Sequence, residues 1–123
     1  MRKRILVVED DEDVGSLLLS VLRDEQRDVF LARDLEAAKA MSSTADVDVI
    51  VLDIALPRGL EGLRFLDWYF GTEKRHGQVI VLSALGREIL NEVRADSRVA
   101  AVMSKPFAVE HLVAMVDELL KSY

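Results

Sequence analysis

The stretch that decides the fold is Val47-Asp48-Val49-Ile50-Val51-Leu52-Asp53. It is almost continuously apolar and rich in β-branched residues, which is typical of a parallel strand buried on both faces. Asp53 closes the run, so this strand would deliver a carboxylate to the carboxyl edge of its sheet. The stretch therefore predicts a central buried strand with an acid at its end.

Shorter apolar runs predict four more strands, at 4–8, 28–32, 79–82 and 99–103. Segments with helical spacing alternate with the strands and predict five helices, at 13–22, 34–41, 63–70, 87–95 and 109–121. We expect Asp13 and Asp34 to cap the first two helices. This alternation predicts an α/β fold, a doubly wound five-stranded parallel sheet flanked by five helices. Because the chain stops at the fifth helix, we expect a single domain over residues 1–123.

The composition excludes several classes of function. The net charge is −6, whereas a nucleic-acid-binding domain needs a basic surface. The chain contains no cysteine, so disulfides and thiolate metal sites within it are excluded. No apolar run approaches the ~20 residues of a membrane helix. We therefore expect a cytoplasmic domain that contacts neither nucleic acid nor a membrane.

Polar residues follow four of the predicted strands. Glu9 and Asp10 come after the first strand, Asp53 ends the third, Ser83 follows the fourth and Lys105 follows the fifth. The carboxyl ends of parallel strands meet at one edge of the sheet, so these side chains should converge. Mg²⁺ prefers hard oxygen ligands and leaves positions for water and phosphate, and a lysine offers a point charge to a phosphoryl group. The pattern predicts a magnesium-dependent phosphate site at which a carboxylate can be the nucleophile.

These residues belong to motifs that closely resemble the receiver domain of two-component response regulators. The motifs are Val8-Glu9-Asp10-Asp11, Leu52-Asp53, Leu56-Pro57, Leu82-Ser83-Ala84 and Lys105-Pro106-Phe107. Each is weak alone, but together, in this order and spacing, they are specific. The resemblance covers residues 5–120 and implies the flavodoxin-like receiver fold.

The resemblance implies a role for each carboxylate. Asp53 would accept a phosphoryl group from a phosphohistidine on a histidine kinase or a histidine phosphotransfer protein. Asp10 and Asp53 would bind Mg²⁺ directly, and Glu9 would bind it through water. The backbone carbonyl of Ala55 would complete the protein ligands.

The resemblance also implies how the site would act as a switch. Lys105 would pair with the phosphate, and Ser83 would supply a hydroxyl that moves toward it. The Lys105–Pro106 peptide bond would be cis, which an X-Pro position permits. Phosphorylation would bias a two-state equilibrium and so switch the binding of a downstream protein target. In this role the domain is a signalling module and not an enzyme.

Two other functions stay open at this point. A magnesium-dependent phosphatase would use the same aspartyl nucleophile, but it needs an acid two residues later to protonate the leaving group, and Ala55 cannot do so. A receiver-fold interaction module that is never phosphorylated is favoured only by Val102, which stands where the family usually has an aromatic residue. The intact Asp10, Asp53 and Lys105 oppose it. Oligomeric state is open as well, a homodimer included.

Two further departures from the family concern the loop after the third strand and the last helix. Gly62 comes one residue later than usual, which indicates an insertion near the site that a loop tolerates cheaply. Met115 stands where receivers of winged-helix transcription factors have a basic residue, which favours a stand-alone receiver or one excised from a larger signalling protein.

The helix at 63–70 contains four of the seven aromatic residues. Helical spacing places Leu63, Leu66 and Phe70 on one face, which we expect to pack on the sheet. A second face carries Phe65, Trp68 and Tyr69. We favour core packing for this second face, and a partner or dimer surface is the alternative.

Overall fold

The computed structural model describes residues 2–54, 59–72, 77–84, 91 and 93–121. Five strands form one parallel sheet in the order β2-β1-β3-β4-β5. They are Lys3–Val8 (β1), Arg27–Ala32 (β2), Val49–Ile54 (β3), Gln78–Ser83 (β4) and Val99–Ser104 (β5). The described helices are Glu12–Leu22 (α1), Leu35–Thr44 (α2), Gly59–Asp67 (α3) and Val109–Lys121 (α5), and α3 continues into a π-helical turn, Trp68–Thr72 (η1).

The predicted helix at 87–95 lies largely outside the described residues, of which 91 and 93–95 are helical. None of the described helices is long and apolar enough to cross a bilayer.

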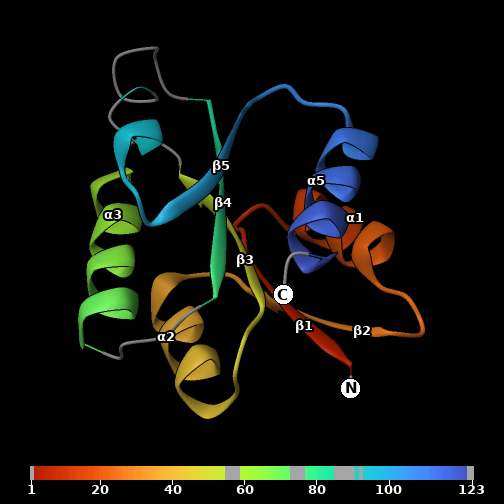
Figure 1. Ribbon diagram of the computed structural model, residues 1–123, viewed down its shortest axis with the longest axis horizontal. Coiled ribbons are helices and arrows are strands. Elements are labelled where there is room, and N and C mark those ends of the chain that lie inside the picture. The colour runs from red at the N-terminus through yellow and green to blue at the C-terminus, as the bar shows by residue number, and fades with distance from the viewer. Residues whose placement is uncertain (1, 55–58, 73–76, 85–90, 92, 122–123) are drawn as a thin grey trace.

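Helices cover both faces of the sheet, as the alternation of elements predicts. Helices α1 and α5 lie on one face, and α2 and α3 lie on the other (Figure 1). The chain passes from β1 outward to β2 and then returns to the far side of β1 for β3. The winding direction therefore reverses between β1 and β3. Ligands of doubly wound sheets bind at such a switch point, beyond the carboxyl ends of the strands.

The central strand β3 has no solvent-facing side, which explains its continuous apolar sequence. Ile50 and Leu52 belong to the core beneath α2 and α3. Val49 and Val51 belong to the core beneath α1 and α5. All four side chains are fully buried, and burying each stabilises the fold by about 1.5–3 kcal/mol.

Aspartates cap the first two helices, and only one of them is the predicted residue. Asp34 caps α2 as predicted, because its Oδ1 accepts a hydrogen bond from the backbone N–H of Ala37 at 2.7 Å. The prediction that Asp13 caps α1 is wrong. Asp11 is the cap, with Oδ1 accepting from the N–H of Val14 at 3.0 Å. Asp11 has the extended backbone that a cap requires, whereas Asp13 lies inside the first turn, where its charge favours the helix dipole.

The aromatic residues of α3 and η1 belong to the core. Phe65 is fully buried and Tyr69 is 1% exposed, and their rings stack with centroids 5.9 Å apart. Trp68 is half-buried against the same cluster, with Lys39 Nζ of α2 5.7 Å from its ring centroid. The favoured interpretation, core packing, is therefore confirmed for Phe65 and Tyr69. The alternative, an exposed aromatic face, is wrong for both, because α3 is covered by α2 as well as by the sheet.

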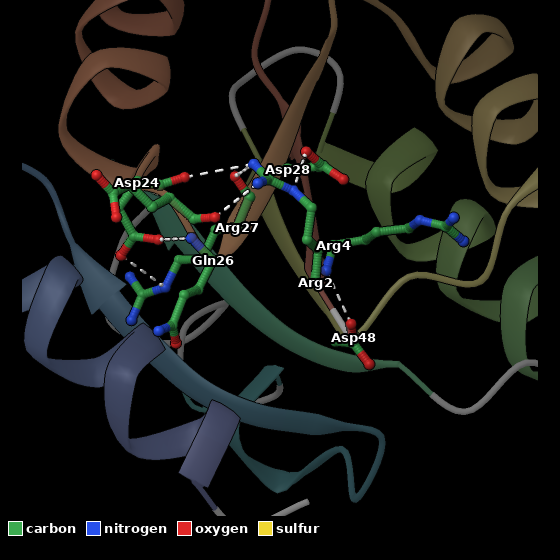
Figure 2. A network of polar contacts seen from close by, with 8 residues as sticks. Arg2, Arg4, Asp24, Gln26, Arg27, Asp28 and Asp48 are labelled. Carbon is green, nitrogen blue, oxygen red and sulfur yellow. Dashed lines mark hydrogen bonds and ion pairs between the residues drawn. The ribbon is translucent and has the colours of Figure 1, made fainter.

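A polar network lies at the amino edge of the sheet (Figure 2). Arg2 Nε is 2.8 Å from Asp28 Oδ1, which ties the start of β1 to β2. The backbone N–H of Arg4 donates to Asp48 Oδ2 at 2.8 Å, which ties β1 to the segment before β3. The Arg2 side chain thus pairs with an acid at this edge, away from the carboxyl ends of the strands.

Candidate functional site

The predicted lysine, Lys105, and two of the predicted carboxylates meet at the carboxyl edge of the sheet. Glu9 follows β1, Asp53 lies near the end of β3, and Lys105 follows β5. Lys105 Nζ is 2.9 Å from Asp53 Oδ2 and 3.7 Å from Glu9 Oε2. The carboxylates of Glu9 and Asp53 are buried, with 1% and 5% of their side-chain surface exposed, while Lys105 is 27% exposed. Buried charge is therefore concentrated where the winding of the sheet reverses.

Three carboxylates at this edge are close enough to share one cation. Glu9, Asp10 and Asp53 each offer an oxygen within 4.8 Å of the others. Among the described residues, Glu9 Oε2 and Asp53 Oδ1 are buried oxygens without a hydrogen-bond partner. A buried acceptor without a partner costs about 1–3 kcal/mol, and more when it is charged. A hard divalent cation would satisfy both oxygens, so the residues present fit Mg²⁺.

Burial raises the pKa of Glu9 to about 7, and the neighbouring Asp53 carboxylate adds to this effect. The backbone N–H of Asp11, which donates to Glu9 Oε1 at 3.0 Å, and the charge of Lys105 act in the opposite direction. A bound cation would favour the ionised carboxylate.

Lys105 keeps its positive charge at this edge. Burial by itself lowers the pKa of Lys105, but the hydrogen bond to Asp53 and the charges of Asp53 and Glu9 raise it above its ordinary value. The site therefore holds a permanent cation against the carboxylate of Asp53.

Backbone hydrogen bonds hold the segments that carry these side chains. The N–H of Lys105 donates to the carbonyl of Ser83 at 2.8 Å, and the N–H of Glu9 donates to the carbonyl of Ala32 at 3.0 Å. The Lys105–Pro106 peptide bond is cis, as predicted. Ser83 ends β4, is 1% exposed and lies opposite Ile54 of β3. Each predicted site residue that the structure describes thus belongs to the end of a strand or to the residues directly after it.

Five of the six predicted site residues lie within the described residues, and the sixth, Ala55, lies outside them. Asp11 is not among the predicted site residues, yet it caps α1 and also donates its N–H to Glu9. Residue type could not have identified this role, because Asp11 and Asp13 are equally favourable cap residues.

Comparison with known proteins gives one family over nearly the whole chain. The family model of the response regulator receiver domain matches residues 5–117. Protein Rrf1 of Nitratidesulfovibrio vulgaris is 34% identical over 123 residues, which is 100% of this chain and 86% of that protein. The alkaline phosphatase synthesis transcriptional regulatory protein PhoP of Bacillus subtilis is 31% identical over 121 residues, 98% of this chain. The chain spans 50% of the length of PhoP and 49% of that of CpxR from Klebsiella pneumoniae, another relative.

Solved structures agree with this result. The receiver domain of Francisella response regulator 1452 superposes with a TM-score of 0.85 at 28% identity, and the match covers 98% of both chains. A response regulator from Thermotoga maritima superposes with a TM-score of 0.80 at 21% identity over 98% of this chain, which shows the fold alone.

Proposed function

Because this chain belongs to the family of response regulator receiver domains, we propose that it takes up a phosphoryl group on Asp53 and thereby switches the binding of a downstream protein. Two-component receivers are signalling modules that work with a histidine kinase. The donor here would be a phosphohistidine of such a kinase or of a histidine phosphotransfer protein. A single receiver domain over residues 1–123 would carry out this exchange in the cytoplasm. The observation that supports the proposal best is Lys105 Nζ at 2.9 Å from Asp53 Oδ2, beside the three-carboxylate cluster.

The proposed step is an in-line transfer. A carboxylate oxygen of Asp53 attacks the phosphorus, the new P–O bond forms, and the bond from phosphorus to the imidazole nitrogen breaks with its electron pair returning to the ring. Such transfers need positioning and neutralisation of charge more than covalent help from the protein. Glu9, Asp10 and Asp53, with the carbonyl of Ala55, would hold Mg²⁺, which supplies charge neutralisation at the phosphoryl oxygens.

Two further residues would respond to the phosphoryl group. Lys105 already pairs with the carboxylate of Asp53, so it would pair with a phosphoryl oxygen once Asp53 is esterified. The Ser83 hydroxyl would donate to another phosphoryl oxygen and draw the end of β4 toward the site. Phosphate can only bias a two-state equilibrium that the chain already has. We expect this bias to change the surface of β5 and α5, together with the helix predicted at 87–95.

A second candidate, an interaction module that is never phosphorylated, is favoured by Val102. This residue is half-buried in β5, opposite Val81 of β4, and packs against the core. Val102 has no ring to rotate, so it cannot report phosphorylation in the way that the family's usual aromatic residue does. The complete set of Asp10, Asp53 and Lys105 opposes this candidate, because a module without phosphorylation has no use for acids clustered beside a lysine.

Intact mass spectrometry after incubation with acetyl phosphate and Mg²⁺ separates the two candidates. We expect an adduct of about 80 Da, the mass of one phosphoryl group. The adduct should be absent from Asp53→Asn and from samples that contain a chelator. No adduct with acetyl phosphate or with a phosphorylated histidine donor would overturn the proposal and support the unphosphorylated module.

A further inference from the structure

Gly62 lies where α3 packs against Ile54, the last residue of β3. It is a buried residue of α3. A Cβ atom at this position would lie 2.9 Å from Ile54 Cγ1 and 3.4 Å from Ile54 Cδ1. The first distance is shorter than packed carbon atoms tolerate. Glycine is unfavourable in a helix compared with alanine, so its presence here has a packing reason, the close approach of α3 to Ile54.

Ile54 connects this contact to the candidate site. It directly follows Asp53, ends β3, and is 1% exposed. In the sheet it lies opposite Ser83, the predicted hydroxyl donor. Its side chain is β-branched, so its γ-carbon cannot swing away without changing rotamer or moving the backbone. A side chain at position 62 would therefore force Ile54 to change rotamer or shift the backbone next to Asp53.

Gly15 offers a matched comparison on the opposite face of the sheet (Figure 1). It is a buried glycine of α1, the helix that follows β1 as α3 follows β3. A Cβ atom there would lie 3.0 Å from Leu31 Cδ2 and 3.1 Å from Leu31 Cδ1. These atoms are the far end of a flexible side chain, which can give way by a few tenths of an ångström. Leu31 lies in the outer strand β2, and neither its sequence neighbours nor its partner in β1, Val7, is a predicted site residue.

We propose that Gly62 is a positioning residue, which lets α3 rest on Ile54 and so fixes the carboxylate of Asp53 relative to Ser83. This inference rests on the proposed phosphoryl uptake by Asp53. Gly62 would then set the position of the phosphoacceptor Asp53, in addition to any effect on the loop that precedes α3. Reacting groups displaced by 1 Å lose about 100-fold in rate. A shift of a few tenths of an ångström in Gly62→Ala should then slow uptake by about fivefold.

The test compares Gly62→Ala with Gly15→Ala at temperatures well below both unfolding midpoints. The first measurement is the initial rate of phosphoryl uptake from acetyl phosphate at saturating Mg²⁺. The second is the backbone amide shift of Asp53 and Ile54 in nitrogen–proton correlation spectra without metal. We expect slower uptake and shifted amides in Gly62→Ala only. Gly15→Ala should stay within about twofold of the natural rate.

A rescue experiment separates positioning from a general loss of structure. Ile54→Ala removes the γ-carbon that the new methyl group would meet. Adding Gly62→Ala to Ile54→Ala should then change the rate by less than about twofold, whereas the same substitution in the natural chain slows it about fivefold. The proposal would be overturned if Gly62→Ala slowed uptake equally in the Ile54→Ala chain and in the natural chain. It would also be overturned if Gly62→Ala alone took up phosphate as fast as the natural chain.

The test still decides the proposal if Gly62→Ala does not fold or if the natural chain takes up no phosphate. If Gly62→Ala does not fold, the substitution is made together with Ile54→Val, which removes the second contact atom, Cδ1. Uptake at the rate of Ile54→Val alone would then overturn the proposal, and slower uptake would support it. If the natural chain takes up no phosphate, the proposed function fails, while the amide shifts still show whether Gly62 positions Asp53.

Discussion

Replacing Lys105 with methionine tests the electrostatics of the candidate site most directly. Lys105 Nζ lies 2.9 Å from Asp53 Oδ2 and 3.7 Å from Glu9 Oε2, and both carboxylates are buried. Methionine keeps an apolar stem of similar length and removes the charge, so little packing is lost. The substitution therefore leaves two buried carboxylates without their counter-charge.

The size of the effect follows from the distance and the exposure. With an effective dielectric constant of about 20, unit charges at the Lys105–Asp53 distance attract by about 6 kcal/mol before desolvation is subtracted. Removing one partner of a buried ion pair costs about 3–5 kcal/mol. Lys105 is 27% exposed, and solvent screens part of the attraction. We therefore expect the metal-free variant to lose about 2–3 kcal/mol of unfolding free energy.

Urea unfolding at about pH 8, above the raised pKa of Glu9, measures this loss as a lower midpoint at unchanged slope. Mg²⁺ should stabilise Lys105→Met more than the natural chain, because the cation replaces the missing charge in the folded state. Lys121→Met, on an exposed residue in the last turn of α5, is the control and should change stability by less than about 0.5 kcal/mol. The reasoning would be refuted if Lys105→Met had the same urea midpoint as the natural chain. It would also be refuted if Mg²⁺ stabilised Lys105→Met less than it stabilises the natural chain.

Three further predictions concern contacts outside the metal cluster. Hydrogen bonds from Arg98 hold the pKa of Asp96 below its ordinary value. The ionised carboxylate therefore stabilises the fold at pH values above the ordinary pKa. This stabilisation is lost as the pH falls through the lowered pKa of the folded state. Asp96→Asn should therefore cost about 1 kcal/mol at neutral pH, and urea unfolding should show the difference from the natural chain shrinking in acid. Tyr69→Phe removes the acceptor for the buried N–H of Gly77, 3.0 Å from Tyr69 Oη, and should lower unfolding free energy by about 1–2 kcal/mol; an unchanged urea midpoint would contradict this. Asp11→Ala removes the cap of α1 and should lower the unfolding free energy by about 1 kcal/mol. The thermal unfolding midpoint measures this loss, and an unchanged midpoint would show that the cap contributes little.

The sequence predicted the sheet because burial leaves a direct record in it. Residues 47–53 are apolar at nearly every position, and in the structure Ile50 and Val51 point into different cores. The predicted site follows from the same strands, because parallel strands bring their carboxyl ends to one edge. Asp53 and Lys105 are 52 positions apart by their numbers, yet their charged atoms are 2.9 Å apart.

Errors arose where the outcome depends on neighbours that helical spacing does not reveal. Asp11 and Asp13 are equally good caps by residue type, and the choice depends on where the backbone leaves β1. For Phe65 the favoured interpretation, core packing, is correct, but helical spacing alone leaves a partner surface open as an alternative. Helix α2 covers that side of α3, and the ring is buried with Leu66.

The sequence by itself determined the order and type of the elements and the residues that meet at the carboxyl edge, because both follow from local patterns and from the topology of parallel strands. Only the tertiary structure decided how tightly these residues are held. The burial of Glu9, its raised pKa, and the close approach of Gly62 to Ile54 depend on helices packing across the sheet. Such contacts join residues from separate elements at distances of a few ångströms, and no spacing within a single element encodes them.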